Sequence, residues 1–563
     1  MTLLNFTFYK VNNIRQDLDS RNFDYETQYP LTDVTLQPQF ETLNNFSLVT
    51  DSEILEIIKT HGLKCSFSDP FPDDLLRENI DVFVPLWTYL VNLSLTTGSM
   101  DCLKHADIIP LLKGADLDTE ILNNFRPVSH LQFLGKLIER VVLRRLNKHI
   151  SLNNFDVTNQ HGYKKGHGTE TILLKITNDI LVASDKKTAT VLLLLDLSAA
   201  FDTVNIDVLL KILLSEIGIT GTALQWFRSF LTNRTMRVKI NEQYSETFVL
   251  EFGIPQGSVL GPVLFNIYIR SIYKYAESTG FSIKGFADDH QLYISFSPSL
   301  QFHFLGDKIR QIFSIITNWM NCFFLKLNPE KSKIIVFGPE SVKDVITLHG
   351  VFVDNDCIRF RNLVENLGVK LDSKLTLSHQ VNSCVSSAFS SIKTISRLKA
   401  FLTEKEKCTL ATSLVVTKID YCNSLYYNIN SNLLRKLQYV QNCAARLVFN
   451  RRKFDHATCL LEKLHWLPVK ERIIYKISLL IHKCLYSIAP FDLCNLLVFD
   501  PLRTYKLKSV NKSSSSWGDR AFSTYAPKVW NTLPYDLRVE PSTDKLEKFL
   551  KTHLFVNCYI ANN

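Results

Sequence analysis

The sequence lacks any hydrophobic run long enough to cross a membrane. Its densest apolar segment, residues 191–195, is ended at once by Asp196, whereas a membrane-spanning helix needs about 20 predominantly apolar residues. The N-terminus carries asparagine and lysine where a secretion signal would have an apolar stretch. From these absences we expect an intracellular protein with no membrane partner.

Closely paired cysteines and internal repeats are also missing. None of the 12 cysteines stands in a C-x-x-C pair, so we interpret them as reduced core residues. Apolar residues make up 46% of the chain and charged residues 21%, which excludes a mostly disordered protein. A chain of 563 residues can bury a large core and corresponds to roughly three to four domains of ordinary size.

Positive charge is concentrated in one stretch of the chain. The net charge of +9 is small for this length. Residues 431–480 contain ten Lys and Arg residues against three Asp and Glu residues, a surplus of seven. Such a density favours a polyanion partner, and a solvated helix face explains it equally well.

Apolar periodicity predicts alternating helices and strands. Helices are expected at residues 52–61, 75–93, 133–150, 169–183, 263–275 and 301–321. Strands are expected at residues 190–197 and 334–337, with hairpins joining 237–241 to 247–251 and 283–286 to 292–296. From Ser378 onward the pattern is helical for about 110 residues, with a capping box at residues 403–406. This order indicates an α+β fold in which helices cover one side of a sheet.

Three carboxylates stand at the ends of apolar strands. Asp196 ends a buried strand, and Asp288 and Asp289 occupy a tight hairpin turn. Alone, the first would be a capping residue and the pair a solvated turn. Together they favour a divalent-cation site, because apolar strands hold like charges at their tips only at a cost that a cation removes. Mg²⁺ is held by one or two carboxylates plus phosphates and water, and two such ions clamp a phosphoryl transfer.

A glycine-rich bend supplies the second signal. Residues 253–258 read GIPQGS, and the segment that follows, VLGP, leads into a helix. Such a bend permits close backbone approach and presents one amide side chain, that of Gln256. The bend alone is a weak signal. It gains weight from its order, because Asp196 precedes it by about 60 residues and the Asp288-Asp289 pair follows it by about 30.

Eight segments, taken in order, resemble the motifs of one protein family. They are residues 64–70 (KCSFSDP), 124–129 (NFRPVS), 160–171 (QHGYKKGHGTET), 195–202 (LDLSAAFD), 253–265 (GIPQGSVLGPVLF), 286–289 (FADD), 325–333 (LKLNPEKSK) and 366–369 (NLGV). The family is the reverse transcriptases of non-LTR (LINE-type) retrotransposons, and the chain resembles most the jockey and chicken-repeat group. Phe286 stands where the family has tyrosine and Gly168 where it has serine; both changes leave the carboxylates in place.

The resemblance implies a right-hand polymerase. This is an α+β fold of fingers, palm and thumb, with an antiparallel palm sheet and an α-helical C-terminal region. The expected segments are an N-terminal extension or remnant at 1–44, fingers and palm at 45–378 with core motifs within 94–372, a helical thumb and basic C-terminal region at 379–507, a Ser-rich linker at 508–516 and a small C-terminal segment at 517–563.

The resemblance also assigns the catalytic positions. Asp196, Asp288 and Asp289 would bind two Mg²⁺ ions, with Mn²⁺ as an alternative, and the carbonyl of Leu197 would assist. Lys331 would either protonate the leaving pyrophosphate as a general acid or be an ordinary surface lysine.

Further positions would contact the nucleotide. Phe201 would lie under the sugar, where its ring excludes a 2′-OH. Gln256 would contact the incoming nucleotide or the template. Arg126 and Lys136 would neutralise phosphates, with a solvated helix face as an equal alternative for Lys136.

Two places would bind the nucleic acid. Gly368 belongs to a turn at the primer side, and the basic run at a helix end would grip template or target. That run consists of Arg451, Arg452 and Lys453. Aromatic residues nearby, Phe454 and Trp466 among them, fit either core packing or stacking on bases.

The function implied is RNA-directed DNA polymerase activity, in which a primer 3′-OH attacks a dNTP on an RNA template by two-metal catalysis. The partners implied are an RNA template, a DNA primer or target and dNTPs. The protein would act in the nucleus, in target-primed synthesis, after translation in the cytoplasm. Two alternatives stay open: a catalytically silent or domesticated RNA-binding relic, and an RNA-templated RNA polymerase. RNA-templated RNA polymerases usually have an acidic residue near the sugar of the nucleotide, at the position that Phe201 occupies in this chain.

One component of complete elements is expected to be missing. Complete retrotransposons of this kind carry an endonuclease domain before the polymerase. In this chain the polymerase-like lead-in begins by about residue 45, which leaves no room for an endonuclease domain in front of it. We therefore expect a truncated copy or a partial gene model, with an endonuclease supplied in trans.

Overall fold

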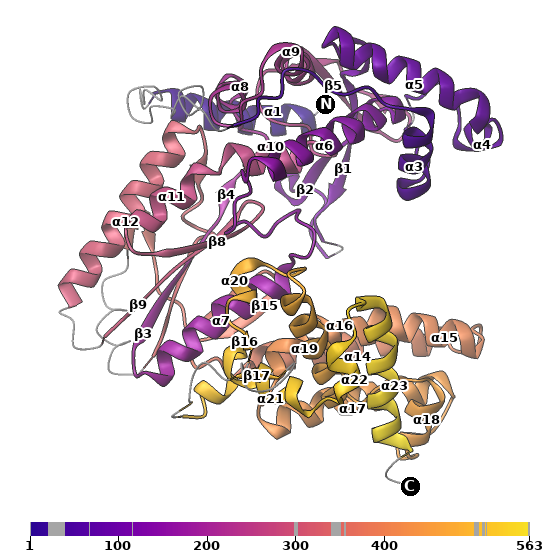
Figure 1. Ribbon diagram of the computed structural model, residues 1–563, viewed down its shortest axis with the longest axis vertical. Helices are drawn as coiled ribbons and strands as arrows, with labels where there is room; N and C mark the ends of the chain where they lie inside the picture. Colours follow the sequence, from indigo (N-terminus) through magenta and orange to yellow (C-terminus); the bar gives the residue numbers. More distant parts are fainter. Residues whose placement is uncertain are drawn as a thin grey trace. The chain divides into compact units, whose positions relative to one another are not determined.

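The computed structural model describes most of the chain, and it divides into two compact units. Described are residues 2–20, 40–66, 68–114, 116–297, 302–338, 351–353, 356–499, 506–508, 513 and 515–560 (Figure 1). The first unit comprises Met1–Val157, Asp196–Ser278 and Ile312–Asn328, and the second comprises Thr158–Leu195, Thr279–Gln311 and Pro329–Asn563. The segment boundaries expected above stay predictions. Phe67 of the lead-in motif and linker residues 509–512 and 514 lie outside the described residues.

The first unit packs helices around a mixed five-stranded sheet. β1 pairs with β2 antiparallel and with β5 parallel, and β7 and β6 extend β5. The helices are α1 (Thr2–Ser20), α3 (Asp51–His61), α4 (Asp73–Glu78), α5 (Ile80–Thr97), α6 (Phe133–Leu152), α8 (Ile206–Ser215), α9 (Gly221–Leu231), α10 (Gly261–Tyr268) and α11 (Ser271–Ser278). The strands are β1 (His105–Leu112), β2 (Phe125–His130), β4 (Leu197–Ser198), β5 (Arg234–Ile240), β6 (Gln243–Tyr244), β7 (Phe248–Leu250) and β10 (Lys326–Leu327). α12 (Phe302–Cys322) contains residues of both units.

Two helices expected to be continuous are broken in the first unit. The prediction of one helix over residues 75–93 is wrong, because the chain breaks at Asn79 between α4 and α5. The side-chain amide of Asn79 donates to the carbonyl of Leu75 (3.0 Å) at the end of α4. The helix predicted at 263–275 is likewise two helices, α10 and α11. The break lies at Ile269 and Arg270, and the guanidinium of Arg270 is 3.7 Å from the carboxylate of Glu216.

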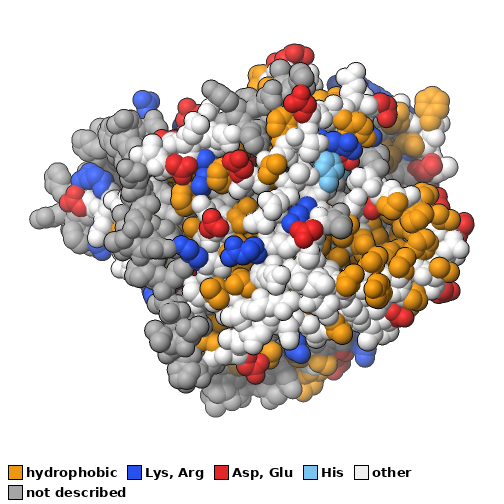
Figure 2. Space-filling view, turned by 90° about the horizontal axis from the view of Figure 1, so that it is seen from above, with side chains coloured by type: hydrophobic (Ala, Val, Ile, Leu, Met, Phe, Trp, Pro, Cys, Tyr) orange, Lys and Arg blue, Asp and Glu red, His pale blue; other side chains and the backbone are white. Residues whose placement is uncertain are grey.

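α5 leaves an apolar stripe on the surface of the first unit. Val82, Leu86, Tyr89 and Leu93 follow helical spacing and are 71, 50, 64 and 44% exposed. Figure 2 shows apolar side chains gathered on the side of the molecule where Figure 1 places α5. Across the described residues, no helix has both the length and the apolarity that a membrane span needs.

The second unit is built on a four-stranded antiparallel sheet in the order β11-β3-β9-β8. Its strands are β3 (Ala189–Leu195), β8 (Ser282–Phe286), β9 (Asp289–Phe296), β11 (Lys333–Phe337), β12 (Val351–Val353), β13 (Asp356–Ile358), β14 (Leu363–Asn366), β15 (Val369–Asp372), β16 (Val498–Phe499) and β17 (Leu507–Lys508). Its helices are α7 (Thr169–Asp185), α14 (Ser378–Leu398), α15 (Glu404–Ala411), α16 (Thr417–Asp420), α17 (Ser431–Val448), α18 (Thr458–Lys463), α19 (Val469–Leu485), α20 (Phe491–Cys494), α21 (Phe522–Thr532), α22 (Tyr535–Val539) and α23 (Thr543–Tyr559). The predicted α+β order, antiparallel sheet and helical C-terminal region are confirmed.

One apolar core joins this sheet to the C-terminal helices. β3 is buried at every position, as its continuous apolar run predicts. The cluster that contains Leu192 of β3 and Ile335 of β11 also contains Leu437 of α17, Trp530 of α21 and Leu554 of α23. The C-terminal helices therefore complete the core of the sheet in this unit.

Candidate active site

The hairpin of β8 and β9 presents two of the predicted carboxylates at its turn. Phe286 pairs with Asp289, so Ala287 and Asp288 form a two-residue turn. Ala287 has φ +57°, the left-handed conformation that tight hairpin turns require. Asp288 is half-buried and Asp289 exposed. The predicted hairpin is confirmed, although its second strand begins at Asp289 instead of residue 292.

A buried glutamine fixes the conformation of this turn. The side-chain amide of Gln160 donates to the carbonyl of Ala287 (3.0 Å), and its Oε1 accepts from the backbone amides of Ala287 (3.0 Å) and Gly162 (2.8 Å). Gln160 is fully buried, so water does not compete for these bonds. A Cβ on Gly162 would lie 2.3 Å from the amide nitrogen of Ala287. The sequence QHG at 160–162 thus holds the turn, a role that the sequence analysis did not assign.

The same segment lies beside β8. The amide of His161 donates to the carbonyl of Gly285 (2.7 Å), and the amide of Gly285 donates to the carbonyl of Asn159 (2.9 Å). Gln160 therefore forms an isolated parallel bridge with Gly285, beside the hairpin that carries the carboxylates.

Asp196 directly follows β3. Leu195, the last residue of β3, pairs with His290 of β9. The carbonyl of Asp196 accepts from the amide of Asn328 (2.8 Å), next to the short ladder of β4 and β10 that contains Leu197. Asp196 lies in the first unit and Asp288 and Asp289 in the second, so the expected meeting of the three carboxylates stays a prediction.

The residue types at these positions suit a hard cation. The donors are carboxylate oxygens and one backbone carbonyl, the ligands that Mg²⁺ takes. The neighbouring His290 is buried, and burial lowers its pKa to about 4, so it adds no positive charge at neutral pH. Within the described ranges, no cluster of three or more His, Cys, Asp or Glu side chains has a metal-holding arrangement.

In the first unit, the glycine-rich bend passes between two backbone segments. Gly253 has φ +85°, and a Cβ there would lie 2.6 Å from the carbonyl oxygen of Asp202. Gly257 has φ +128°, and a Cβ there would lie 2.4 Å from the carbonyl oxygen of Ser129. The amide of Ser129 donates to the carbonyl of Gln256 (2.7 Å). Both glycines are needed for this close approach.

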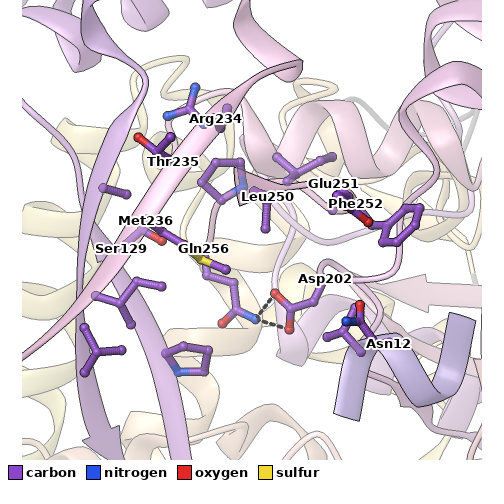
Figure 3. Close-up of a pocket in the computed structure, with 18 residues that line it drawn as sticks. Asn12, Ser129, Asp202, Arg234, Thr235, Met236, Leu250, Glu251, Phe252 and Gln256 are labelled. Atoms are coloured by element: carbon purple, nitrogen blue, oxygen red, sulfur yellow. Dashed lines mark hydrogen bonds between the residues drawn. The ribbon is translucent and has the colours of Figure 1, made fainter. Parts of the chain in front are cut away.

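Gln256 points toward a carboxylate that the sequence analysis missed. Its side-chain amide is 2.9 Å from each carboxylate oxygen of Asp202, and both residues line a cavity between the β1–β5 sheet and the bend (Figure 3). Asn12 of α1 lies at the same cavity. The predicted contact of Gln256 with the nucleotide or template stays a prediction.

Phe201 is held by a stacked ring. Its centroid lies 4.4 Å from that of Phe265 in α10, with 20° between the ring planes, and its carbonyl accepts from the amide of Ile254 (2.9 Å). The ring is half-buried. The stack holds one face of the ring and the hydrogen bond holds the backbone, and the role of Phe201 in sugar selection stays a prediction.

A buried carboxylate anchors the far end of the bend. Glu139 of α6 is 1% exposed and accepts from the hydroxyl of Ser258 (2.6 Å) and from the amides of Val259 (2.6 Å) and Leu260 (3.1 Å). Burial raises the pKa of Glu139. The signal in the sequence was a glutamate on the apolar face of the predicted helix.

The predicted phosphate ligands differ in burial. Arg126 is exposed on β2. Lys136 of α6 is half-buried, and burial lowers its pKa although the carboxylates of Asp69 and Glu139 act in the opposite direction. Lys136 is therefore partly withdrawn from solvent, and its contact with phosphates stays a prediction.

The remaining predicted residues lie in the second unit. Lys331 is exposed in the turn before β11. Gly368 has φ +77° in the two-residue turn between β14 and β15, where the hydroxyl of Tyr421 donates to the carbonyl of Leu367 (2.6 Å).

The basic run follows the end of α17, where the prediction placed it. Arg451, Arg452 and Lys453 are exposed. The ring of Phe454 beside them is 87% exposed, whereas Trp466 is buried. Core packing therefore accounts for Trp466, and Phe454 is available for stacking.

Known proteins resemble this chain over the region that holds these motifs. Residues 113–371 match the family described as reverse transcriptase (RNA-dependent DNA polymerase). The RNA-directed DNA polymerase from mobile element jockey of Drosophila melanogaster is 26% identical over 74% of this chain and 45% of its own length. The probable RNA-directed DNA polymerase from transposon BS of the same species is 26% identical over 62% of this chain and 39% of its own. The chain thus spans less than half of the length of these relatives.

A solved structure adds little. Apo telomerase from Candida tropicalis aligns with 70% of this chain and 63% of its own at 13% identity and a TM-score of 0.37, too weak a likeness to bear on the fold. The family match and the relatives carry the assignment. Residues 113–371 therefore match the reverse transcriptase family, and these relatives support a jockey-like reverse transcriptase of the LINE type.

Proposed function

We propose that this chain is an RNA-directed DNA polymerase that extends a primer 3′-OH with dNTPs on an RNA template. The observation that carries the proposal is the β8–β9 hairpin, which presents Asp288 and Asp289 at a turn held by Gln160, within the part of the chain that matches the reverse transcriptase family. Its fingers, palm and thumb would have the right-hand arrangement of such enzymes.

The three carboxylates would hold the metal ions. Asp196, Asp288 and Asp289, with the carbonyl of Leu197, are the residues that would bind two Mg²⁺. Bound Mg²⁺ would lower the barrier by stabilising the attacking and leaving oxygens of the phosphoryl transfer. The hydrogen bonds of Gln160 to Ala287 would hold the Asp288 turn in one conformation before substrate binds, which would reduce the ordering needed for reaction. Lys331 would donate a proton to the leaving pyrophosphate.

The first unit would bind and select the nucleotide. Phe201, fixed against Phe265, would exclude ribonucleotides by the volume of its ring. Arg126 and Lys136 would pair with phosphates, and Gln256 would turn from Asp202 toward the nucleotide or template. In the second unit, Gly368 would lie near the primer, and the basic run 451–453 would bind nucleic-acid phosphates.

Primer extension tests the proposal. Purified protein with Mg²⁺ should extend a DNA primer on an RNA template with dNTPs, and Asp288→Asn should abolish extension. Extension with NTPs in place of dNTPs would instead indicate an RNA polymerase. Nucleic-acid binding without extension under both conditions would contradict the enzymatic proposal and favour a relic. Action in the nucleus stays part of the proposal.

A further inference from the structure

A buried ion pair lies behind the hairpin that carries Asp288 and Asp289. Lys284 of β8 is 8% exposed, and its ammonium lies 2.8 Å from the carboxylate of Asp492 in α20, itself 15% exposed. Lys284 also donates to the side-chain oxygen of Asn159 (2.5 Å). The pair therefore connects the C-terminal region, beyond the part of the chain that matches the family, to the strand that leads into the turn.

The segment that holds the turn contacts the same carboxylate. The imidazole of His161 is fully buried, and its Nε2 is 3.7 Å from the Asp492 carboxylate. His161 lies between Gln160 and Gly162, the two residues that fix Ala287. Burial by itself would raise the pKa of Asp492, but His161 and Lys284 hold that pKa well below its ordinary value. Asp492 is therefore ionised at neutral pH.

Backbone packing supports the same connection. A Cβ on Gly166 would lie 1.9 Å from the carbonyl oxygen of Ile488, so the backbone at Gly166 lies directly against the segment before α20, as the backbone at Gly162 lies against the turn at Ala287. Gly166 has φ +79°. No side chain fits between these two backbones, so a shift of α20 would be transmitted to the segment that holds the turn.

We infer that Asp492 is a positioning residue for the Asp288-Asp289 turn, acting through Lys284 and His161, and that the C-terminal region is thereby part of the polymerase machinery. The inference rests on the proposed polymerase function. Removing the carboxylate leaves the buried ammonium of Lys284 without its partner, and a buried charge that loses its partner moves or draws in water. β8 would then be held less firmly, and the Asp288-Asp289 turn at its end would occupy a wider range of positions.

The kinetic test uses the full chain and single-nucleotide addition under single-turnover conditions. Asp492→Asn should lower the rate constant about 10- to 100-fold, as loss of an outer partner of a metal site does. The dNTP concentration for half-maximal rate and the affinity for primer-template should not change. The burst amplitude, which counts folded active sites, separates this effect from misfolding. The control is Asp519→Asn, which removes a carboxylate from a surface pair with Lys528 (2.9 Å) in the same unit.

A double variant keeps the test decisive if Asp492→Asn folds poorly. Lys284→Met leaves the carboxylate alone, and Lys284→Met with Asp492→Asn leaves neither charge. The double variant should add nucleotides faster than Lys284→Met, because no uncompensated charge remains. A double variant that is no faster would overturn the inference.

A readout independent of catalysis completes the design. Amide hydrogen exchange at residues 283–290 should be faster in Asp492→Asn than in Asp519→Asn, with exchange at residues 543–559 unchanged. A parent protein that adds no nucleotide would refute the proposed function, and hydrogen exchange alone would then decide the inference. If the parent is active, unchanged exchange at residues 283–290 together with a parental rate constant in Asp492→Asn would overturn the inference. If the parent is inactive, unchanged exchange at residues 283–290 would overturn it alone.

Discussion

Single atoms decide whether the turn at Asp288 can form. Gly162→Ala places a Cβ 2.3 Å from the amide nitrogen of Ala287, so the turn must move. We expect nucleotide addition to fall about 100-fold, the effect of displacing a reacting group by about 1 Å. The control is Gly168→Ala, because nothing lies within 4 Å of a Cβ at Gly168. Parental rates in both variants would contradict the role of the QHG segment.

The ring of Phe201 is a second residue-scale determinant. Phe201→Ala removes the ring that stacks on Phe265 and should raise ribonucleotide incorporation while the Mg²⁺ requirement stays as it was. Competition between dNTP and NTP in primer extension measures this change, and Phe201→Tyr, which keeps the ring, should retain selection. An Ala variant that extends primers with parental dNTP preference would count against the role.

Glu139 should make stability depend on pH. Burial raises its folded pKa above the unfolded value, so the folded state holds the proton more tightly. Stability is then greatest below the ordinary carboxylate pKa and falls as pH rises through that value toward the raised one. Glu139→Gln keeps an acceptor for Ser258 and should remove this fall. Glu139→Ala should cost about 1–3 kcal/mol for each donor left unsatisfied. Chemical denaturation between acid and neutral pH measures both, and a Gln variant with the parental pH profile would argue against the assignment.

At the scale of elements, the loop after α17 should bind nucleic acid through charge. Replacing Arg451, Arg452 and Lys453 by Ala should weaken RNA and DNA binding broadly and reduce the salt slope by up to about 3. Single-nucleotide addition on saturating primer-template should hardly change.

A matched control for this prediction removes the same charge elsewhere. α23 carries three exposed lysines, and their replacement by Ala should leave the salt slope nearly parental. They are Lys545, Lys548 and Lys551. Equal slopes for the two triple variants would reduce the run 451–453 to a solvated surface.

Local sequence patterns predicted the helices and strands better than they predicted the contacts between these elements. The apolar run of β3 predicts a buried strand, and the helical spacing of apolar residues in α6 predicts an amphipathic helix. Both predictions succeed because the order of apolar and polar residues along a segment reflects which side chains are buried. The break at Asn79, where the side-chain amide and the backbone amide both donate to the carbonyl of Leu75, was missed because it does not interrupt the apolar pattern of residues 75–93. The clamp of Gln160 on Ala287 joins residues 127 positions apart in sequence, and no local pattern encodes such a bond. The motif resemblance marked Gln160 and Gly162 without saying what they do.

At the scale of the whole molecule, the three carboxylates should meet. A structure determined with primer-template and Mg²⁺ should place the carboxyl oxygens of Asp196 and Asp288 about 3–5 Å apart, since each Mg²⁺–oxygen distance is about 2.1 Å. Asp289 should lie slightly further out. Asp196 and Asp288 on opposite faces of the sheet would end the polymerase proposal.

The core shared by β3 and the C-terminal helices cannot be completed until the last helices have been synthesised. Leu554 of α23 belongs to the same cluster as Leu192, yet it leaves the ribosome more than 350 residues later. At ordinary translation rates this delay is on the order of tens of seconds. During this delay, a strand with apolar side chains at six of its seven positions lacks the surface that will cover it. A ribosome that stops early therefore releases a chain prone to aggregate, and slow or interrupted translation would limit how much active protein a cell obtains.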